Sequence, residues 1–300
     1  MSGSRELALL AREALATGER GLLAEIVRVD GSHYRRQGAR MVLMQGGRSA
    51  GAISGGCLET DLARRLPDVC AGGRPVEVVY DLRAPEDVVW GLGLGCNGRV
   101  VILLSPLTES VVADLESVAP AVSLLVCGAG PDAVPLARFG LLLGWSVNIV
   151  APRPTPAVQR RFANLGLGAL KTPESLPLLA RQRGTAAVVM THNFLDDLDL
   201  LRRLARVPTA YLGILGPRDR TARLEAGLRE DGIAIPALSL HAPAGLDIGA
   251  DSPEEIALAI AAEIQAALAG RAAGFLRDRE GPMHADGGQA EQQAASAGSA

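Results

Sequence analysis

The chain has 300 residues, of which 48% are hydrophobic and 21% charged, so it is long enough for one large or two ordinary folded domains. A formal net charge of -3 and an aromatic content of 3% exclude the basic surplus and the stacking platforms of general nucleic-acid binders, so we expect no nucleic-acid partner. No apolar run reaches the roughly 18 residues of a membrane-spanning helix, and the first segment lacks the pattern of a secretory signal. We therefore expect a cytoplasmic protein without a membrane partner.

The first region, residues 4–106, mixes helices and strands in an α+β order. Apolar residues at helical spacing predict a helix over 6–16, and a second helix follows the Ser54-Gly55-Gly56 turn over 57–66. Short β-rich runs separated by glycines predict strands over 22–29, 39–44, 76–80 and 99–104. We place an N-terminal domain at 1–115 and a linker at 116–120.

The second region, residues 120–250, alternates strictly between strands and helices. The predicted strands cover 122–127, 146–150, 186–191 and 210–215, and the helices between and after them cover 133–143, 155–165, 195–205 and 218–230. Apolar strands separated by amphipathic segments imply a parallel sheet covered on both faces. The fold class is therefore α/β: an N-terminal α+β domain followed by a Rossmann-like, doubly wound parallel-sheet domain at 120–269.

The C-terminal region begins with a capping box, in which Ser252 is the N-cap, Pro253 the first helical residue and Glu255 the third. This pattern predicts a helix that ends near residue 268. Residues 270–300 lack the apolar content needed to pack, so we expect a disordered tail.

A glycine loop links the first strand of the second region to its helix. In Cys127-Gly128-Ala129-Gly130-Pro131-Asp132-Ala133, Gly128 permits a tight turn and Gly130 lets a phosphate approach the backbone. The acid that would bind a ribose after the second strand is missing, because Ala151 occupies that position. The motif predicts a phosphate site, and the alternative is a Rossmann scaffold in which the loop is only a tight turn.

Basic residues and a thiol form two further motifs. Arg35, Arg36 and Arg40 follow Gly31, where guanidinium groups could grip one anion, or could form an ordinary solvated cluster. Cys57 follows Gly55 and Gly56 at a predicted helix start, where the helix dipole should lower the pKa of the thiol. The alternative is a small packing cysteine.

The remaining motifs are a second cysteine loop and two loops after strands. Cys96 lies in the glycine-rich stretch 90–98, which suits either close backbone approach to a ligand or a glycine hairpin. His192 and Asn193, together with Arg218 and Arg220, follow predicted strands and should face the crevice at the carboxyl edge of the sheet, or be ordinary loop residues. We interpret Cys70 and Cys127 as structural, and the absence of a CxxC spacing makes a zinc site or a disulfide framework unexpected.

Taken together, these motifs resemble the XdhC/CoxI family of xanthine dehydrogenase accessory factors. The matching stretches run in the family's order from about residue 20 to residue 265: GSHYRRQGARMVL, GAISGGCLE, WGLGLGCNGRV, LLVCGAGPDAVPLARFGLLLGW, VVMTHNFLDDL, YLGILGPRDRT and PAGLDIGADSPEEIALAI. The resemblance implies a chaperone that binds molybdenum cofactor, as molybdopterin or its cytosine dinucleotide form, and inserts it into an apo molybdoenzyme of the xanthine dehydrogenase type. It also implies sulfuration of the cofactor with a partner cysteine desulfurase, and we expect a homodimer.

The resemblance carries over onto individual residues. It implies that Cys57 and Cys96 are the two cysteines of the family's motifs and that they could contact molybdenum. The basic residues and the glycine loop described above also match the family: Arg35, Arg36, Arg40, Gly128 and Gly130. Ala151 and Asn97 depart from the residues usual in the family. Thiols for a soft metal and arginines for a phosphate agree with this cargo.

Two other functions stay open from the sequence. The Rossmann pattern by itself would allow an NAD(P)-dependent oxidoreductase, which Ala151 disfavours. A sulfur or nucleotide transferase acting on the cofactor would use Cys57 as a persulfide carrier. The sequence lacks the base, nucleophile and orienting group that hydrolases combine, so we favour a chaperone over an enzyme.

Overall fold

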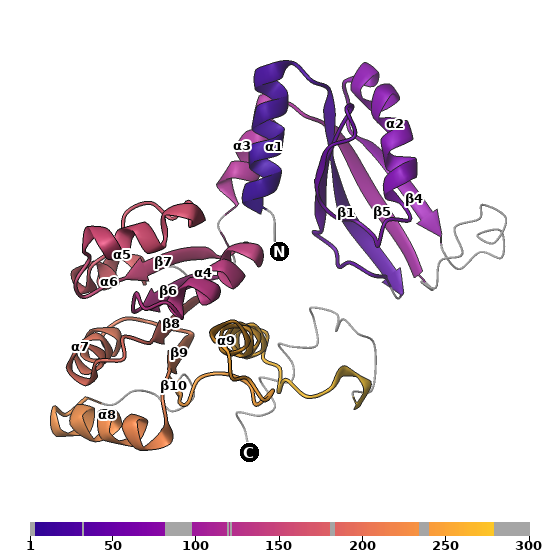
Figure 1. The fold of residues 1–300 in the computed structure, drawn as a ribbon. Coiled ribbons are helices and arrows are strands. Elements are labelled where there is room, and N and C mark those ends of the chain that lie inside the picture. The colour runs from indigo at the N-terminus through magenta and orange to yellow at the C-terminus, as the bar shows by residue number, and fades with distance from the viewer. Residues whose placement is uncertain are drawn as a thin grey trace. The chain divides into compact units, whose positions relative to one another are not determined.

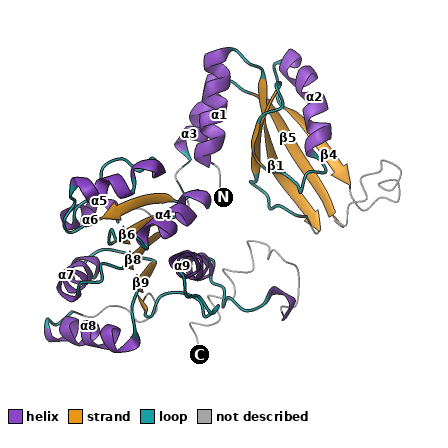
Figure 2. Cartoon of the chain, in the orientation of Figure 1, coloured by secondary structure: helices purple, strands orange, loops and turns teal. Residues whose placement is uncertain are grey.

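The computed structural model describes residues 4–31, 33–81, 98–118, 120, 122–180, 184–233 and 240–278. The chain divides into two compact units: described residues 4–118 together with 274–278 form one, and described residues 120–273 form the other (Figure 1). Each unit has its own sheet, and Figure 2 shows helices packed beside both sheets. Within the described ranges we find no helix with the length and apolarity that a bilayer crossing demands.

The first unit is an antiparallel α+β domain, as predicted. Its sheet has the strand order β3-β2-β1-β5-β4, and all of the pairings are antiparallel. The elements are α1 (Ser4–Thr17), β1 (Gly21–Gly31), β2 (Arg40–Met44), β3 (Ser49–Gly51), α2 (Glu59–Gly72), β4 (Val76–Asp81), β5 (Gly98–Pro106) and α3 (Glu109–Ser117).

Two elements of this unit were not predicted. Strand β3 is too short for an alternating pattern to show in the sequence. Helix α3 begins at the N-cap Thr108, whose hydroxyl accepts a hydrogen bond from Val111 N at 3.3 Å, and it extends into the first two residues of the stretch assigned to the linker.

Alternation along β1 explains why both faces of this sheet are covered. Leu22, Ala24 and Ile26 belong to the apolar core that includes α2, whereas Leu23 belongs to the core formed with α1 and α3. Successive side chains of a strand point to opposite faces, so a run of apolar residues requires a helix on each side.

The second unit has a parallel sheet with the strand order β10-β9-β8-β6-β7, which confirms the Rossmann-like prediction. Its elements are β6 (Ser123–Cys127), α4 (Ala133–Leu142), β7 (Ser146–Val150), α5 (Pro156–Arg161), α6 (Leu176–Leu179), β8 (Thr185–Val189), α7 (Phe194–Leu204), β9 (Tyr211–Ile214), α8 (Arg218–Glu230), β10 (Leu240–His241) and α9 (Pro253–Leu268). The short elements α6 and β10 were not predicted.

Strand β6 lies between β7 and β8, so the chain reverses its direction of travel across the sheet at β6. Leu124 and Val126 pack toward α4 and α9, whereas Leu125 and Cys127 pack toward α6, α7 and α8 on the other face. Figure 1 shows α4 and α9 on one side of this sheet and α7 and α8 on the other. The carboxyl ends of β6 and β8 therefore flank the topological switch point, where doubly wound sheets bind their ligands.

The capping box at the start of α9 is confirmed. Ser252 Oγ accepts a hydrogen bond from Glu255 N at 3.3 Å, and Glu255 Oε2 accepts one from Ser252 N at 2.9 Å. A short 3-10 helix, Leu276–Asp278, follows. Residues 279–300 of the predicted tail lie outside the described residues, and its disorder stays a prediction.

Candidate functional site

The first candidate site is the switch point of the second unit, where the glycine loop after β6 meets the turn after β8. Gly128 has φ +148°, and a methyl group built on it would overlap the carbonyl oxygen of Met190. Its N–H donates to Val150 O at 2.9 Å. Gly128 is thus required for the close approach of β6 and the segment that follows β8, whatever the loop binds.

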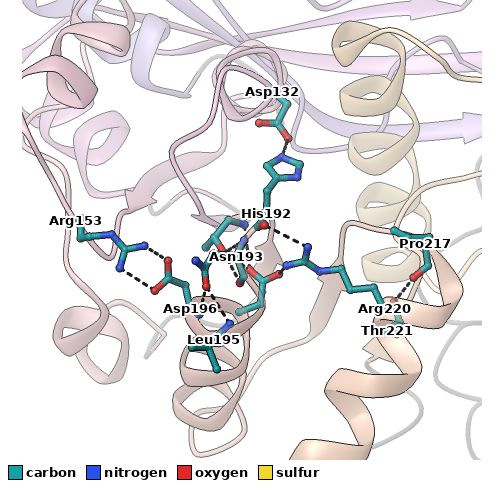
Figure 3. Close-up of polar contacts among 11 residues, drawn as sticks. Asp132, Arg153, His192, Asn193, Leu195, Asp196, Pro217, Arg220 and Thr221 are labelled. Carbon is teal, nitrogen blue, oxygen red and sulfur yellow. Dashed lines mark hydrogen bonds and ion pairs between the residues drawn. The ribbon is translucent and has the colours of Figure 1, made fainter.

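A histidine reaches across this switch point to the glycine loop. His192 Nε2 lies 2.7 Å from Asp132 Oδ2, and the side chains are 59% and 18% exposed respectively (Figure 3). His192 has φ +61°, a left-handed conformation that is uncommon for a residue other than glycine. The contact joins residues that are 60 positions apart in the sequence.

A buried ion pair holds the turn that carries His192. Asp197, with a side chain only 1% exposed, accepts hydrogen bonds from Arg220 Nη2 at 2.5 Å, from Thr191 N at 3.1 Å and from the Thr191 hydroxyl. Arg220 Nη1 donates to His192 O at 3.3 Å (Figure 3). The guanidinium therefore joins the turn after β8 to helix α8 and helps to keep His192 in its strained conformation.

Further polar contacts line the same edge of the sheet. Asn193 caps α7, because its Oδ1 accepts hydrogen bonds from Leu195 N at 3.0 Å and Asp196 N at 3.1 Å. Asp196 also accepts two hydrogen bonds from Arg153, one of them from Nη1 at 3.0 Å. Arg218, at the start of α8, is exposed.

The position after β7 offers no group for a ribose. Ala151 is only 2% exposed, and its N–H donates to Lys171 O at 2.8 Å. A Rossmann enzyme that uses NAD places a carboxylate near this point to bind the ribose hydroxyls. The sequence lacks an acid at this position, and the structure shows that the residue present, Ala151, is also buried.

Two polar atoms at this switch point have no partner. Among the buried side-chain nitrogen and oxygen atoms of the described residues, Asp132 Oδ1 and Arg220 Nε lack a hydrogen bond. Unsatisfied buried polar groups are rare in folded proteins and concentrate where strain or function requires them. Both belong to the network around His192, which marks this network as the unusual part of the unit.

The second candidate site is the turn between β3 and α2 in the first unit, which carries Cys57. Glu59 Oε1 accepts hydrogen bonds from Ser54 N at 2.8 Å and Ile53 N at 3.3 Å, and its Oε2 accepts one from the Ser54 hydroxyl. Ser54 Oγ in turn accepts from Gly56 N at 3.2 Å and Leu58 N at 3.1 Å. The backbone is therefore held by hydrogen bonds on both sides of the thiol, at Gly56 and at Leu58.

Burial of Glu59 would by itself raise its pKa, but the hydrogen bonds from Ser54 and the backbone hold that pKa below its ordinary value of 4.5. Gly56 has φ +110°, which favours glycine. No heavy atom lies within 4 Å of a methyl group built on Gly55 or Gly56, so the space beside both is open. The turn thus combines a fixed backbone with free room.

The cysteines of the described residues differ in their surroundings. Cys57 is partly exposed and packs along the edge of the core that faces α2. Cys70 is also partly exposed, and burial raises the pKa of its thiol. Cys127 is fully buried, and burial together with the charge of Asp197 raises the pKa of its thiol to about 12. Cys127 is therefore a packing residue.

The arginines of the predicted anion site lie in the loop between β1 and β2 and at the start of β2. The loop between β1 and β2 carries Arg35 and Arg36, which are partly exposed and exposed respectively. Arg40 lies on β2 opposite Glu25, and its Nε donates to Glu25 Oε2 at 3.0 Å. The guanidinium of Arg40 is thus paired across the two strands, and the role of Arg40 in anion binding stays a prediction.

The same loop buries His33, which is only 6% exposed and whose Nδ1 lies 3.2 Å from both the backbone nitrogen and the backbone oxygen of Arg35. Burial lowers the pKa of His33, whereas its hydrogen bond with Arg35 and the charge of Glu59 act in the opposite direction. Ala39, at the end of this loop, and Cys57 both pack against the same apolar core, so the arginine loop and the cysteine turn border one core.

Cys96 and its glycine-rich loop lie outside the described residues. Within the described ranges, no group of three or more histidine, cysteine, aspartate or glutamate side chains is placed to hold a metal ion. The role of Cys96 as a second sulfur donor stays a prediction.

Sequence reasoning missed the carboxylates that organise both sites: Glu59, Asp132 and Asp197. A signal existed for Glu59, because a serine five residues before a glutamate at a helix start resembles an extended capping motif. Asp132 contacts His192 and Asp197 binds Arg220, and both partners lie on other elements, so no local sequence pattern indicates these contacts.

Comparisons with known proteins cover both units. The family model described as the XdhC Rossmann domain matches residues 124–264, and the one described as the XdhC and CoxI family matches residues 14–81. A Bacillus subtilis (strain 168) protein named as a probable xanthine dehydrogenase subunit is 30% identical over 311 residues, which cover 82% of this chain and 92% of the relative.

A second relative is the molybdenum cofactor insertion chaperone PaoD of Escherichia coli (strain K12), which is 28% identical over 87% of each chain. The crystal structure of a protein named as a xanthine dehydrogenase from Bacillus halodurans aligns with a TM-score of 0.72 at 27% identity. That alignment covers 92% of this chain and 99% of the other.

Proposed function

The chain belongs to the XdhC/CoxI family, and from that premise we propose that it carries molybdenum cofactor to an apo molybdoenzyme of the xanthine dehydrogenase type. The observation that carries this proposal is the 28% identity to the insertion chaperone PaoD, which extends over 87% of both chains. The cofactor, as molybdopterin or its cytosine dinucleotide form, is then cargo. The protein holds it, shields it and passes it on.

In this proposal the Cys57 thiolate is a soft ligand for the molybdenum of the cargo, and Cys96 is a second one. Three features of the turn support the role of Cys57. The thiol is partly exposed, the turn around it is fixed through Ser54 and Glu59, and the space beside Gly55 and Gly56 is open. Packing against the core, which Cys57 also does, would not require an open space beside the turn.

The phosphate of the cargo is assigned to Arg35 and Arg36. Both precede β2 in the loop that buries His33, and Ala39 at the end of this loop packs against the same apolar core as Cys57. Guanidinium groups bind phosphate through paired hydrogen bonds. His192 and Arg218, which the sequence also placed among the cofactor-binding residues, are exposed at the switch point of the second unit, and their part in binding stays a prediction.

We further propose that a partner cysteine desulfurase provides sulfur for the bound cofactor before insertion, and that the chaperone acts as a homodimer in the cytoplasm. The protein needs no turnover of its own for this task. Its activity is measured instead as the activity gained by the client enzyme.

The test is to purify the protein after co-expression with an intact cofactor pathway. Molybdenum content and the fluorescence of the oxidised pterin give the cofactor bound per protomer, and mixing with an apo molybdoenzyme gives the insertion activity. We expect Cys57→Ser to lower cofactor retention at least about tenfold, equal to about 1.4 kcal/mol of binding free energy.

The matched control is Cys70→Ser, since Cys70 is also a partly exposed free cysteine of the same unit. Its retention and insertion activity should equal those of the wild type. Wild-type retention by Cys57→Ser would refute the role of the thiolate, and a wild-type protein that holds no cofactor would refute the proposed cargo.

A further inference from the structure

The glycine loop of the second unit is covered by one of the chain's own side chains. In a dinucleotide-binding turn, the second glycine leaves room for a pyrophosphate to approach the backbone. Here a methyl group built on Gly130 would overlap Asp132 Oδ1 and would lie 3.8 Å from His192 Cδ2. A phosphate at that point would therefore meet a carboxylate oxygen instead of open backbone.

The carboxylate is held in this position from the opposite side of the switch point. His192 Nε2 lies 2.7 Å from Asp132 Oδ2, while Asp132 Oδ1 is buried without a hydrogen-bond partner (Figure 3). Arg220 holds His192 O at 3.3 Å and binds the buried Asp197 at 2.5 Å. Two like charges in a partly buried site repel far more strongly than in water.

The start of α4 also offers fewer N–H groups than a phosphate site normally provides. Pro131 and Pro135 have no N–H, and the N–H groups of Ala133 and Val134 donate to Gly130 O at 3.2 Å and to Pro131 O at 3.3 Å. Phosphate binding at a helix N-terminus depends on unpaired N–H groups. An anion there would have little to offset the repulsion by Asp132.

We propose that Asp132, held by His192, determines the ligand specificity of this crevice by keeping phosphate groups off the glycine loop. The ligands excluded are nucleoside diphosphates and dinucleotides, including the nicotinamide cofactors that the Rossmann pattern suggests. This inference does not rest on the proposed chaperone function, because it concerns the glycine loop of the second unit, whereas the cargo is assigned to Cys57, Arg35 and Arg36 of the first unit. A cytosine dinucleotide form of the cargo would then be held without its pyrophosphate on this loop.

The experiment is equilibrium binding of ADP, which carries the pyrophosphate of a dinucleotide, to the wild-type protein and to Asp132→Asn. Asparagine keeps the shape of the side chain and removes its charge. We expect Asp132→Asn to bind ADP at least about fivefold more tightly than the wild type. A smaller gain overturns the proposal, and so does the absence of binding by both proteins up to about 5 mM ADP.

Two further variants locate the effect. Asp219→Asn removes an exposed carboxylate in the first turn of α8 and should leave ADP binding as in the wild type. Adding Gly130→Ala to Asp132→Asn puts a methyl group on the loop and should abolish the gain. A gain that survives this methyl group would place ADP elsewhere and would overturn the proposal. Circular dichroism and melting curves confirm that each variant is folded.

Discussion

Each unit has a glycine-containing turn that leads from a strand to a helix. In each unit a carboxylate side chain of the chain itself contacts this turn. In the first unit, Glu59 accepts hydrogen bonds from Ser54 and Ile53 and leaves Cys57 partly exposed. In the second unit, Asp132 instead lies over Gly130, on the face that a ligand would approach. The same chemical group therefore organises one turn and covers the other.

The difference shows that a glycine motif does not by itself define a binding site. The glycines permit a close approach in both turns, but the nearest carboxylate determines what can approach. In the second unit, the position of the carboxylate depends on His192 and on the ion pair behind it, which lie far away in the sequence. The predictions below test these two arrangements, from the largest expected effect to the smallest.

The largest effect should follow from loss of the buried carboxylate that supports the His192 turn. Asp197→Ala leaves Arg220 without its partner and Thr191 N without its acceptor, and we expect a loss of about 3–5 kcal/mol in unfolding free energy. Urea unfolding measures this loss. The probe is the fluorescence of Trp145, which is buried in the second unit, and both proteins carry Trp90→Phe so that Trp145 is the remaining tryptophan.

Asp196→Ala is the matched control one residue earlier on α7. The Asp196 side chain is 17% exposed and that of its partner Arg153 is 69% exposed, so solvent screens this pair and we expect a loss of about 1 kcal/mol. Equal losses for Asp197→Ala and Asp196→Ala would show that the His192 turn does not depend on the buried pair.

A moderate effect should follow from loss of the carboxylate that organises the cysteine turn. Glu59→Ala leaves the N–H groups of Ser54 and Ile53 unpaired, which should cost about 1–3 kcal/mol. Hydrogen exchange of a peptide that covers 52–60 should accelerate, because Gly56 and Leu58 also depend on Ser54. Unchanged exchange in that peptide would show that Glu59 does not hold the cysteine turn. The control is Glu77→Ala, at an exposed position of β4, which should leave the exchange of this peptide unchanged.

The stabilisation by Glu59 should depend on pH in a defined direction. The folded state lowers the pKa of Glu59 below its ordinary value of 4.5, so the folded state favours the ionised form. The contribution is complete above 4.5 and is lost as the pH falls through the folded-state pKa. The stability difference between wild type and Glu59→Gln should therefore shrink from pH 7 to pH 3, and a difference that grows would be inconsistent with it.

The smallest effect concerns thiol reactivity, which changes no stability. With a maleimide at neutral pH, Cys57 should be modified in the folded protein while Cys127 is not, because Cys127 is buried and its pKa is raised to about 12. Peptide mass spectrometry measures both in one sample, and urea should release Cys127. Early labelling of Cys127 in the folded state would show that the second unit opens at β6.

Much of the fold could be predicted because its signals are local. Strict alternation of apolar strands and amphipathic helices indicated the parallel sheet, and the Ser252 capping box marked the start of α9. Turn glycines such as Gly56 and Gly128 do have positive φ. The short elements β3, α6 and β10 were missed because periodicity needs more residues than they have.

The sequence by itself determined the fold class, the family and the positions of the glycine turns, since each depends on neighbouring residues or on ordered motifs along the chain. Only the tertiary structure decided which charged groups remain available. Arg40 donates a hydrogen bond to Glu25 on the neighbouring strand, and Asp132 contacts His192 across the switch point. Such pairings depend on strand register and on crossovers between strands, so residues far apart in the sequence become neighbours without any local pattern to announce it.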